Sequence, residues 1–294
     1  MVGMSGWKKF GVVCIFLAPS FIALVAFSLG PMVGTAWVSL QDWNLIRPAR
    51  FVGLANFSEL WHDEKFHRGL FNTLYYLVGY IPLVTLGGLA MAVLLNTRVK
   101  LVSLFRAMYF LPVITSWVVV SLLWRWLLNP KDGLVNFLLR KVGIHGPGWW
   151  TDSTWAMPSV ILASAWKDFG FVMVILLAGL QSIPETLYEA ARLDGAGAWR
   201  QFRLVTLPLL TPSMFFVLVI SLINGFQVFD QVWVMTPNGG PGGSTSVVME
   251  QVVKNTFDYG RAGYASAMSI VLFAIILIVT AVQLRMQKRW VFYG

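Results

Sequence analysis

The sequence predicts an all-α integral membrane protein with six transmembrane helices. Of its 294 residues, 57% are hydrophobic and only 12% are charged, whereas soluble domains carry about 25% charged residues. The mean hydropathy of +0.69 exceeds what one globular core requires, so the excess apolar side chains must face lipid. The 14 Trp and 21 Phe fit aromatic belts at two membrane interfaces. Helix is the expected structure of each span because lipid cannot satisfy open backbone groups.

Six apolar stretches are long enough to cross about 30 Å of hydrocarbon, which takes about 20 helical residues. We interpret them as one transmembrane domain that covers residues 1–294. Prolines interrupt the first three stretches, which membrane helices tolerate better than soluble helices do. The expected spans are 11–38, 71–95, 103–128, 158–180, 212–235 and 265–284.

The first span follows Lys8 and Lys9, so a cleaved signal peptide with a basic leader is an alternative. Its apolar run is too long for a signal peptide, and no convincing A-x-A cleavage site follows. Five further spans also need an anchor. We therefore interpret the first span as a membrane helix.

Six spans place both termini on the same side of the membrane. If that side is cytoplasmic, the short inner segments carry basic residues at a higher density than the longer outer segments, as the positive-inside rule requires. Both termini are therefore expected in the cytoplasm. The inner basic residues are Lys8, Lys9, Arg98, Lys100, Arg106, Arg192, Arg200, Arg203, Arg285, Lys288 and Arg289.

The composition argues against several kinds of site. Cys14 is the only cysteine, so neither a disulfide framework nor a cysteine-rich metal site can form within the chain. His62 and His67 have i,i+5 spacing, which is poor for one helix face, and no metal site is expected. The net charge of +9 is scattered through short loops rather than gathered on one face, so we expect no nucleic-acid partner. The glycine-rich run 238–243 lacks the Gly-Lys pair of a phosphate-binding loop and is interpreted as an outer loop.

Segment 182–209, between the fourth and fifth spans, is the most informative part of the sequence. Ser182 and Glu185 have the spacing of a capping box, with Pro184 in the first turn of a short helix. That helix is expected to stop at Gly195, which would take a positive φ there.

A second, amphipathic helix is expected over about 198–206, ending before Pro208. The result is a compact pair of helices across the cytoplasmic face. Ala190 and Ala191 have almost no side chain, so the backbone of another protein can approach closely. Glu189 supplies a charge for a basic partner.

This segment resembles the signature loop of the permease subunits of ATP-binding cassette (ABC) importers. That loop has Glu-Ala-Ala, three residues, Gly, nine residues, Ile, one residue and Leu-Pro. The corresponding residues here are Glu189-Ala190-Ala191, Gly195, Val205 and Leu207-Pro208, with Val205 as the one departure. Shorter matches to the carbohydrate-uptake branch cover most of the chain: Leu54-Ala55-Asn56-Phe57, Asn72-Thr73, Phe105-Arg106-Ala107, Leu111-Pro112 and Phe229-Asp230.

The resemblance is greatest to the first permease subunit of glycerol-3-phosphate and oligosaccharide importers. It implies a MetI-like fold whose cytoplasmic coupling helix docks in a cleft of an ATPase subunit. It also implies a second homologous permease, two ATPase subunits that bind ATP and magnesium, and an extracytoplasmic solute-binding protein, all at a bacterial or archaeal plasma membrane. No cofactor is expected in this chain. The implied coupling residues are Glu189, Ala190, Ala191, Asp194, Gly195 and Pro208.

Polar residues inside the fourth and fifth spans are candidates for the solute pathway. An ionisable residue within a membrane is by default a hypothesis for a functional site, and the substrate sites of transporters tend to lie near the midplane. Lys167 lies near mid-membrane, and Ser221, Asn224 and Gln227 recur along one helix face. The alternative is structural: polar side chains that hold helices together, or Lys167 paired with Asp230 or a partner's carboxylate. The candidate residues are Lys167, Phe171, Ser221, Asn224, Gly225 and Gln227.

The function expected is therefore a permease subunit without catalytic activity, which alternates between outward- and inward-facing states for a sugar or sugar-like solute. An autonomous secondary transporter is the alternative. It would need inverted repeats and intramembrane carboxylates, for which only Asp168 and Asp230 qualify. A membrane enzyme would need a clustered nucleophile, base or metal site, and none is visible. Lys167 would favour a phosphate-bearing solute, but one lysine does not decide the substrate.

Overall fold

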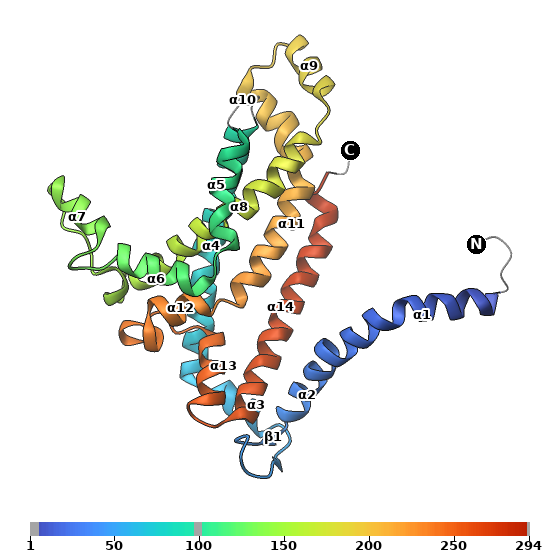
Figure 1. Cartoon of the computed structure of the whole chain (residues 1–294), viewed down its shortest axis with the longest axis vertical. Coiled ribbons are helices and arrows are strands. Elements are labelled where there is room, and N and C mark those ends of the chain that lie inside the picture. Colours follow the sequence, from blue (N-terminus) through green and yellow to red (C-terminus); the bar gives the residue numbers. More distant parts are fainter. Residues whose placement is uncertain (1–5, 97–101, 293–294) are drawn as a thin grey trace. The chain divides into compact units, whose positions relative to one another are not determined.

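The structure is a computed structural model that describes residues 6–96 and 102–292 (Figure 1). Arg98 and Lys100, which contribute to the expected inner charge, lie outside the described residues. The helices are α1 (Gly6–Leu24), α2 (Gly30–Val38), α3 (Ala55–His62), α4 (Glu64–Leu95), α5 (Val102–Ile114), α6 (Trp117–Leu127), α7 (Leu134–Lys141), α8 (Ala156–Gln181), α9 (Glu185–Leu193), α10 (Ala198–Gln201), α11 (Leu207–Phe226), α12 (Asp230–Met235), α13 (Val248–Phe257) and α14 (Ala262–Trp290).

Shorter elements connect these helices. The strands β1 (Gln41–Asp42) and β2 (Arg50–Phe51) form one antiparallel pair, in which Gln41 lies opposite Phe51. Single 3-10 turns span Trp149–Thr151, Pro237–Gly239 and Pro241–Gly243, and π-helical segments span Val25–Leu29 and Phe202–Thr206.

Two compact units make up the chain. One comprises the described residues up to Asp63 together with Val252–Val271, and the other comprises Glu64–Gln251 and the residues from Leu272 onward. That residues 1–294 form a single domain stays a prediction.

Within the described residues, five helical stretches are long and apolar enough to cross a membrane, and a sixth span results if the bent pair α5 and α6 is counted as one. The five stretches are Val12–Val38, Glu64–Leu95, Ala156–Gln181, Ala198–Phe226 and Ala262–Trp290. A multi-pass membrane protein is thus confirmed, but two of the expected spans differ from prediction.

The third span, expected as one helix over 103–128, is broken. α5 ends at Ile114, α6 begins at Trp117, and the two helices are bent by 100°. Ser116 has ψ of 140°, well outside the helical range. The helical hydrogen bonding is weakened here because Pro112 has no N–H to donate and the Thr115 hydroxyl donates to the carbonyl of Leu111.

The fifth span is shifted toward the N-terminus relative to the expected 212–235. It begins at Ala198 and ends at Phe226. Gln227, Val228 and Phe229 then leave the helix before α12 begins. The prediction was wrong at this end because the apolar residues that follow, among them Val228 and Val232, are buried within the protein rather than facing lipid.

The prediction that a second helix ends before Pro208 was also wrong, because the chain stays helical through this proline. The N–H of Leu207 reaches five residues back to the carbonyl of Phe202 and closes a π-helical turn. The N–H of Gly30 donates to the carbonyl of Val25 in the same way, directly before Pro31. In both places the wider turn immediately precedes a proline, which has no N–H of its own to donate.

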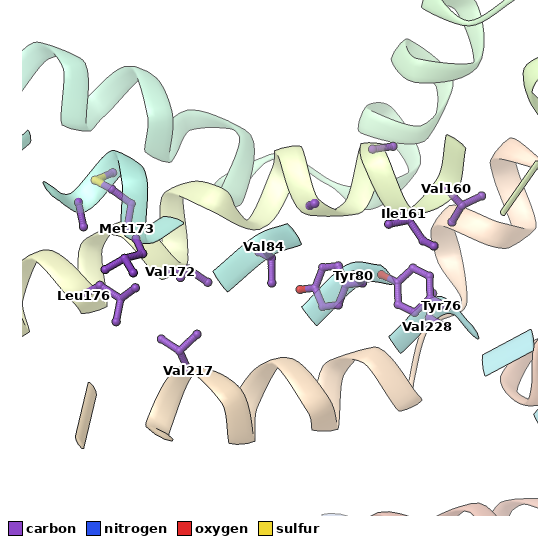
Figure 2. Packing of buried hydrophobic residues seen from close by; sticks show 14 of the residues in the cluster. Tyr76, Tyr80, Val84, Val160, Ile161, Val172, Met173, Leu176, Val217 and Val228 are labelled. Atoms are coloured by element: carbon purple, nitrogen blue, oxygen red, sulfur yellow. The ribbon is translucent and has the colours of Figure 1, made fainter. Parts of the chain in front are cut away.

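The core of the larger unit lies where α8 packs against α4 and α11 (Figure 2). Tyr76, Tyr80 and Val84 of α4 face the side chains of α8, and Val217 of α11 closes the cluster from the other side. The rings of Tyr76 and Tyr80 are stacked with centroids 5.2 Å apart. α4 therefore directs a pair of tyrosines toward the two helices that carry the candidate pathway residues.

Two of the short family-like motifs fix nearby loops through hydrogen bonds. Asn72 donates hydrogen bonds to the carbonyls of Gly243 and Ser246, and the hydroxyl of Thr73 accepts one from the N–H of Val248. These contacts tie the glycine-rich loop to α4. In the smaller unit, Asn56 donates to the carbonyls of Ser39 and Gln41 beside the strand pair.

The smaller unit also contains a surface ion pair. Arg261 donates to both carboxylate oxygens of Glu59, at 2.7 and 2.6 Å. This hydrogen bonding raises the pKa of the Arg261 guanidinium above its usual value.

Candidate functional site

The segment with the signature spacing forms a helical hairpin made of α9, a turn and α10. Gly195 has a φ of +75° and ends α9, as the sequence predicts. Its N–H donates to the carbonyl of Arg192, and the N–H of Ala196 donates to that of Ala191. This pair of hydrogen bonds is a Schellman motif, which requires the left-handed conformation at Gly195.

The capping box expected from Ser182 and Glu185 does not form. Ser182 ends α8, and its hydroxyl donates to the carbonyl of Gly179. Pro184 is the N-cap residue of α9, and Glu185 is the first residue of that helix. The spacing was misleading because the serine hydroxyl binds a carbonyl at the end of α8 instead of capping α9. The last carbonyls of a helix have no partner within it and require donors.

Side-chain hydrogen bonds hold the two arms of the hairpin together. The hydroxyls of Tyr188 and Thr206 lie 3.0 Å apart, which links α9 to the π-helical segment. Gln201 donates to the carbonyl of Ala196 at 2.7 Å and so braces the turn. The hairpin is therefore joined to the residues that lead into α11 through specific contacts.

The outer surface of the hairpin is open and partly apolar. Leu193 is 90% exposed and Trp199 is 73% exposed. Glu189 and Ala190 are exposed on α9, whereas Ala191 is half-buried. Large exposed apolar side chains beside charged groups are typical of a surface that another protein covers.

Two neighbouring cavities lie among α4, α8 and the end of α11, and both are lined by Tyr80, Asp168 and Asn224. Their volumes are about 260 and 190 Å³. The larger one is also lined by Tyr76, Trp117, Gln227, Val228, Phe229, Asp230 and Gln231. The smaller one is also lined by Val113, Lys167, Phe171, Val172, Ile220 and Ser221.

Five of the six candidate pathway residues line these cavities, and Gly225 does not. A Cβ at Gly225 would overlap the side chain of Leu77, so the glycine lets α11 approach α4. Ser221 lines the smaller cavity, Gln227 the larger one, and Asn224 both. Because α11 ends at Phe226, Gln227 is its C-cap residue rather than part of the helical stripe that the spacing predicts.

Lys167 has close partners that the sequence did not indicate. Its ammonium donates to the carbonyl of Val113 at 2.9 Å and lies 4.6 Å from the ring centroid of Trp117. It thereby binds one of the last carbonyls of α5 and the first residue of α6. The cation satisfies a helix C-terminus at the break in the third span, a favourable position for positive charge.

Asp168, the next residue of α8, points to a different neighbour. Its carboxylate accepts a hydrogen bond from the hydroxyl of Tyr80 at 2.7 Å. Consecutive residues of one helix thus hold α4 on one side and the broken span on the other.

The sequence also failed to place several lining residues on the pathway. Tyr76 and Tyr80 recur at i and i+4 on an apolar helix, a spacing that puts them on one face and would have been a usable signal. Asp168 and Asp230 were noted only as carboxylates. Trp117 had no signal, because its place beside the cavity depends on the break before it.

Comparisons with known proteins identify the family of the chain. The family model described as "Binding-protein-dependent transport system inner membrane component" matches residues 84–291. A probable ABC transporter permease of Pyrococcus horikoshii is 36% identical, over 91% of this chain and 92% of its own length. The trehalose/maltose transport system permease protein MalF of Thermococcus litoralis is 33% identical, over 93% and 92%. A chain of a bacterial alginate ABC transporter, solved with an alginate-bound periplasmic protein, has a TM-score of 0.85 and 25% identity, over 98% and 97%.

Proposed function

The chain belongs to the family of binding-protein-dependent transport system inner membrane components, and on that premise we propose that it forms half of the translocation pathway for a sugar or sugar-like solute. The MetI-like importer fold inferred from the signature loop is confirmed by the family match and by the structural likeness. The chain is a transport subunit of an ABC importer, and its solute is the part that we propose.

The observation that carries the proposal is the pair of cavities beside Tyr80, Asp168 and Asn224. Aromatic rings can cover the apolar C–H faces of a sugar, while amides and carboxylates can pair with its hydroxyls. Two of the relatives are named for saccharides, trehalose/maltose and alginate. Both the lining chemistry and the relatives therefore support a saccharide.

The hairpin of α9 and α10 supports a second part of the proposal, which is coupling to ATP hydrolysis in separate subunits. Leu193 and Trp199 offer an exposed apolar surface, and Glu189 offers a carboxylate beside it. We propose that this surface docks on an ATPase subunit that binds ATP and magnesium. The assembly would contain two such subunits, a second homologous permease, and an extracytoplasmic protein that delivers the solute at the plasma membrane of a bacterial or archaeal cell.

The test is uptake of labelled oligosaccharides into proteoliposomes that contain the assembled importer. We expect uptake to require both ATP and the binding protein, and Asn224→Leu to reduce it at least tenfold. The matched control is Asn96→Leu, which changes an exposed asparagine at the end of α4. Equal uptake by the two variants would contradict the role of the cavity.

The same assay tests the alternative of an autonomous secondary transporter. Uptake by this chain alone, driven by a proton or sodium gradient without ATP, would contradict the proposed function and support that alternative.

A further inference from the structure

The relatives leave the charge of the solute open, because trehalose and maltose are neutral whereas alginate is an acidic polysaccharide. Resting on the proposed function, we propose that the cavities of this chain select an uncharged, hydroxyl-rich solute and disfavour an anionic one. The charged groups around the cavities and their partners carry this inference.

Two carboxylates line the larger cavity. Asp168 lies on its α8 side, and Asp230 lies at the start of α12 on another side. The hydrogen bond from Tyr80 to one oxygen of Asp168 holds that carboxylate in place beside the cavity. A phosphate, sulfonate or uronate in this cavity would face like charges, which disfavours binding unless a cation intervenes.

Lys167 is the only basic side chain that lines either cavity among the residues that the structure describes, and it lines the smaller one. Its ammonium is already bound to the carbonyl of Val113 and lies over the ring of Trp117. The residue is only 5% exposed. One of its three N–H donors is therefore held by the end of α5, and the cation lies beside the smaller cavity rather than between the two carboxylates of the larger one.

The formal charge of the linings follows from these residues. Two carboxylates and one ammonium sum to −1 across both cavities. The larger cavity by itself has a formal charge of −2, because it is lined by the two carboxylates and not by the lysine. A phosphate-bearing solute, which Lys167 by itself would favour, does not fit this arrangement.

The remaining lining suits a neutral polyol. Asn224 and Gln227 can each donate and accept hydrogen bonds, and both carboxylates can accept from hydroxyl groups. The rings of Tyr76, Tyr80 and Trp117 add aromatic surface to the same cavity. Sugar hydroxyls are donors, so for them the acidic groups are partners rather than obstacles.

The experiment measures binding at the cavity itself, because the binding protein has a selectivity of its own. The assembled importer carries Gln227→Cys on a Cys14→Ala background, and the rate of maleimide labelling is followed with increasing saccharide. Neutral maltotriose is compared with trigalacturonate, an acidic trisaccharide of the same length. We expect maltotriose to slow labelling at concentrations at least tenfold lower than trigalacturonate does.

Charge removal provides the second arm. Asp230→Asn and Asp168→Asn should each improve protection by trigalacturonate about tenfold, a change of ~1.4 kcal/mol, and alter that by maltotriose much less. Asp168→Asn keeps an oxygen that can accept from Tyr80. The control Asp258→Asn removes an exposed carboxylate that lines neither cavity and should leave both values unchanged.

Stronger protection by trigalacturonate, or equal responses of all three Asp variants, would overturn the inference. If neither saccharide protects while the importer still transports a sugar, the inference fails and the proposed function stands. If no saccharide is transported at all, the proposed function fails as well.

Discussion

At the scale of single residues, Lys167 connects the two halves of the broken third span. Its partners, the carbonyl of Val113 and the ring of Trp117, lie on either side of the break. A cation near mid-membrane is costly unless it is paired, and here a helix C-terminus and an aromatic face provide the pairing. The charge therefore has a structural use that is independent of any solute.

We expect Lys167→Met to lower the free energy of unfolding by about 1.5–3 kcal/mol, the range for a hydrogen bond to a charged group. The measurement is thermal or denaturant unfolding of the purified importer. Lys131→Met, which changes an exposed lysine between α6 and α7, is the control. A destabilisation no greater than that of Lys131→Met would show that the contacts of Lys167 with the broken span do not stabilise the protein. Lys167→Arg should retain part of the stability.

Gly195 and Gly197 offer a matched comparison within the hairpin of α9 and α10. A Cβ at either position meets nothing within 4 Å, but only Gly195 has a positive φ. Gly195→Ala should cost about 1–2 kcal/mol because a side chain disfavours that conformation. It should therefore weaken ATPase copurification and ATP-driven uptake, while Gly197→Ala leaves both near wild type. Equal effects of the two substitutions would mean that the Schellman turn is not what matters for coupling.

At the scale of elements, α8 organises the larger unit because it packs against α4, α5 and α11. Its close approach to α5 depends on Gly170, where a Cβ would overlap the carbonyl of Tyr109. The obstacle is backbone, so it cannot rotate away as a side chain could. Small residues at such crossings are the usual means by which membrane helices pack closely.

Gly170→Ala should accordingly force α5 and α8 apart and destabilise the protein by about 1–3 kcal/mol, as overpacking does. The readout is the melting temperature together with the yield of assembled importer. Gly34→Ala in α2 is the control, since a Cβ there meets nothing within 4 Å. An unchanged melting temperature for Gly170→Ala would show that the two helices are not held at this separation.

At the scale of the whole molecule, the remaining question is orientation in the membrane. The density of basic residues predicts both termini in the cytoplasm. The hairpin would lie on the same side, where ATPase subunits could reach it.

Cysteine labelling tests this orientation. On a Cys14→Ala background, needed because Cys14 is exposed, an impermeant maleimide added outside intact cells should label Ile46→Cys and not Arg200→Cys. Ile46 is 89% exposed in the loop between α2 and α3. Labelling of Arg200→Cys from outside would show that the topology is the reverse of the one predicted. The hairpin would then be out of reach of cytoplasmic ATPases.

Much of the architecture was predictable because it depends on local properties. Hydropathy over about 20 residues is enough to mark a membrane span. The ending of α9 at Gly195 follows from the special backbone freedom of one residue. The spacing around Glu189 likewise predicts the hairpin from residues that are close together in the sequence.

Other features depend on partners far away in the sequence. The carbonyl of Val113, next to the break, is bound by Lys167, 54 residues later, and the carboxylate of Asp168 is held by Tyr80, 88 residues earlier. The apolar residues after Phe226 are hydrophobic enough to continue a span, but they pack inside the protein instead.

The sequence by itself therefore determined the membrane class, the family, the hairpin of α9 and α10, and four of the polar residues beside the cavities. Only the tertiary structure decided where the third span breaks, where the fifth span ends, that Lys167 is bound to the broken span, and that Asp168 and Asp230 face one cavity. The physical reason is that hydropathy and helix termination are local, whereas the partner of a buried charge is set by which helices pack together.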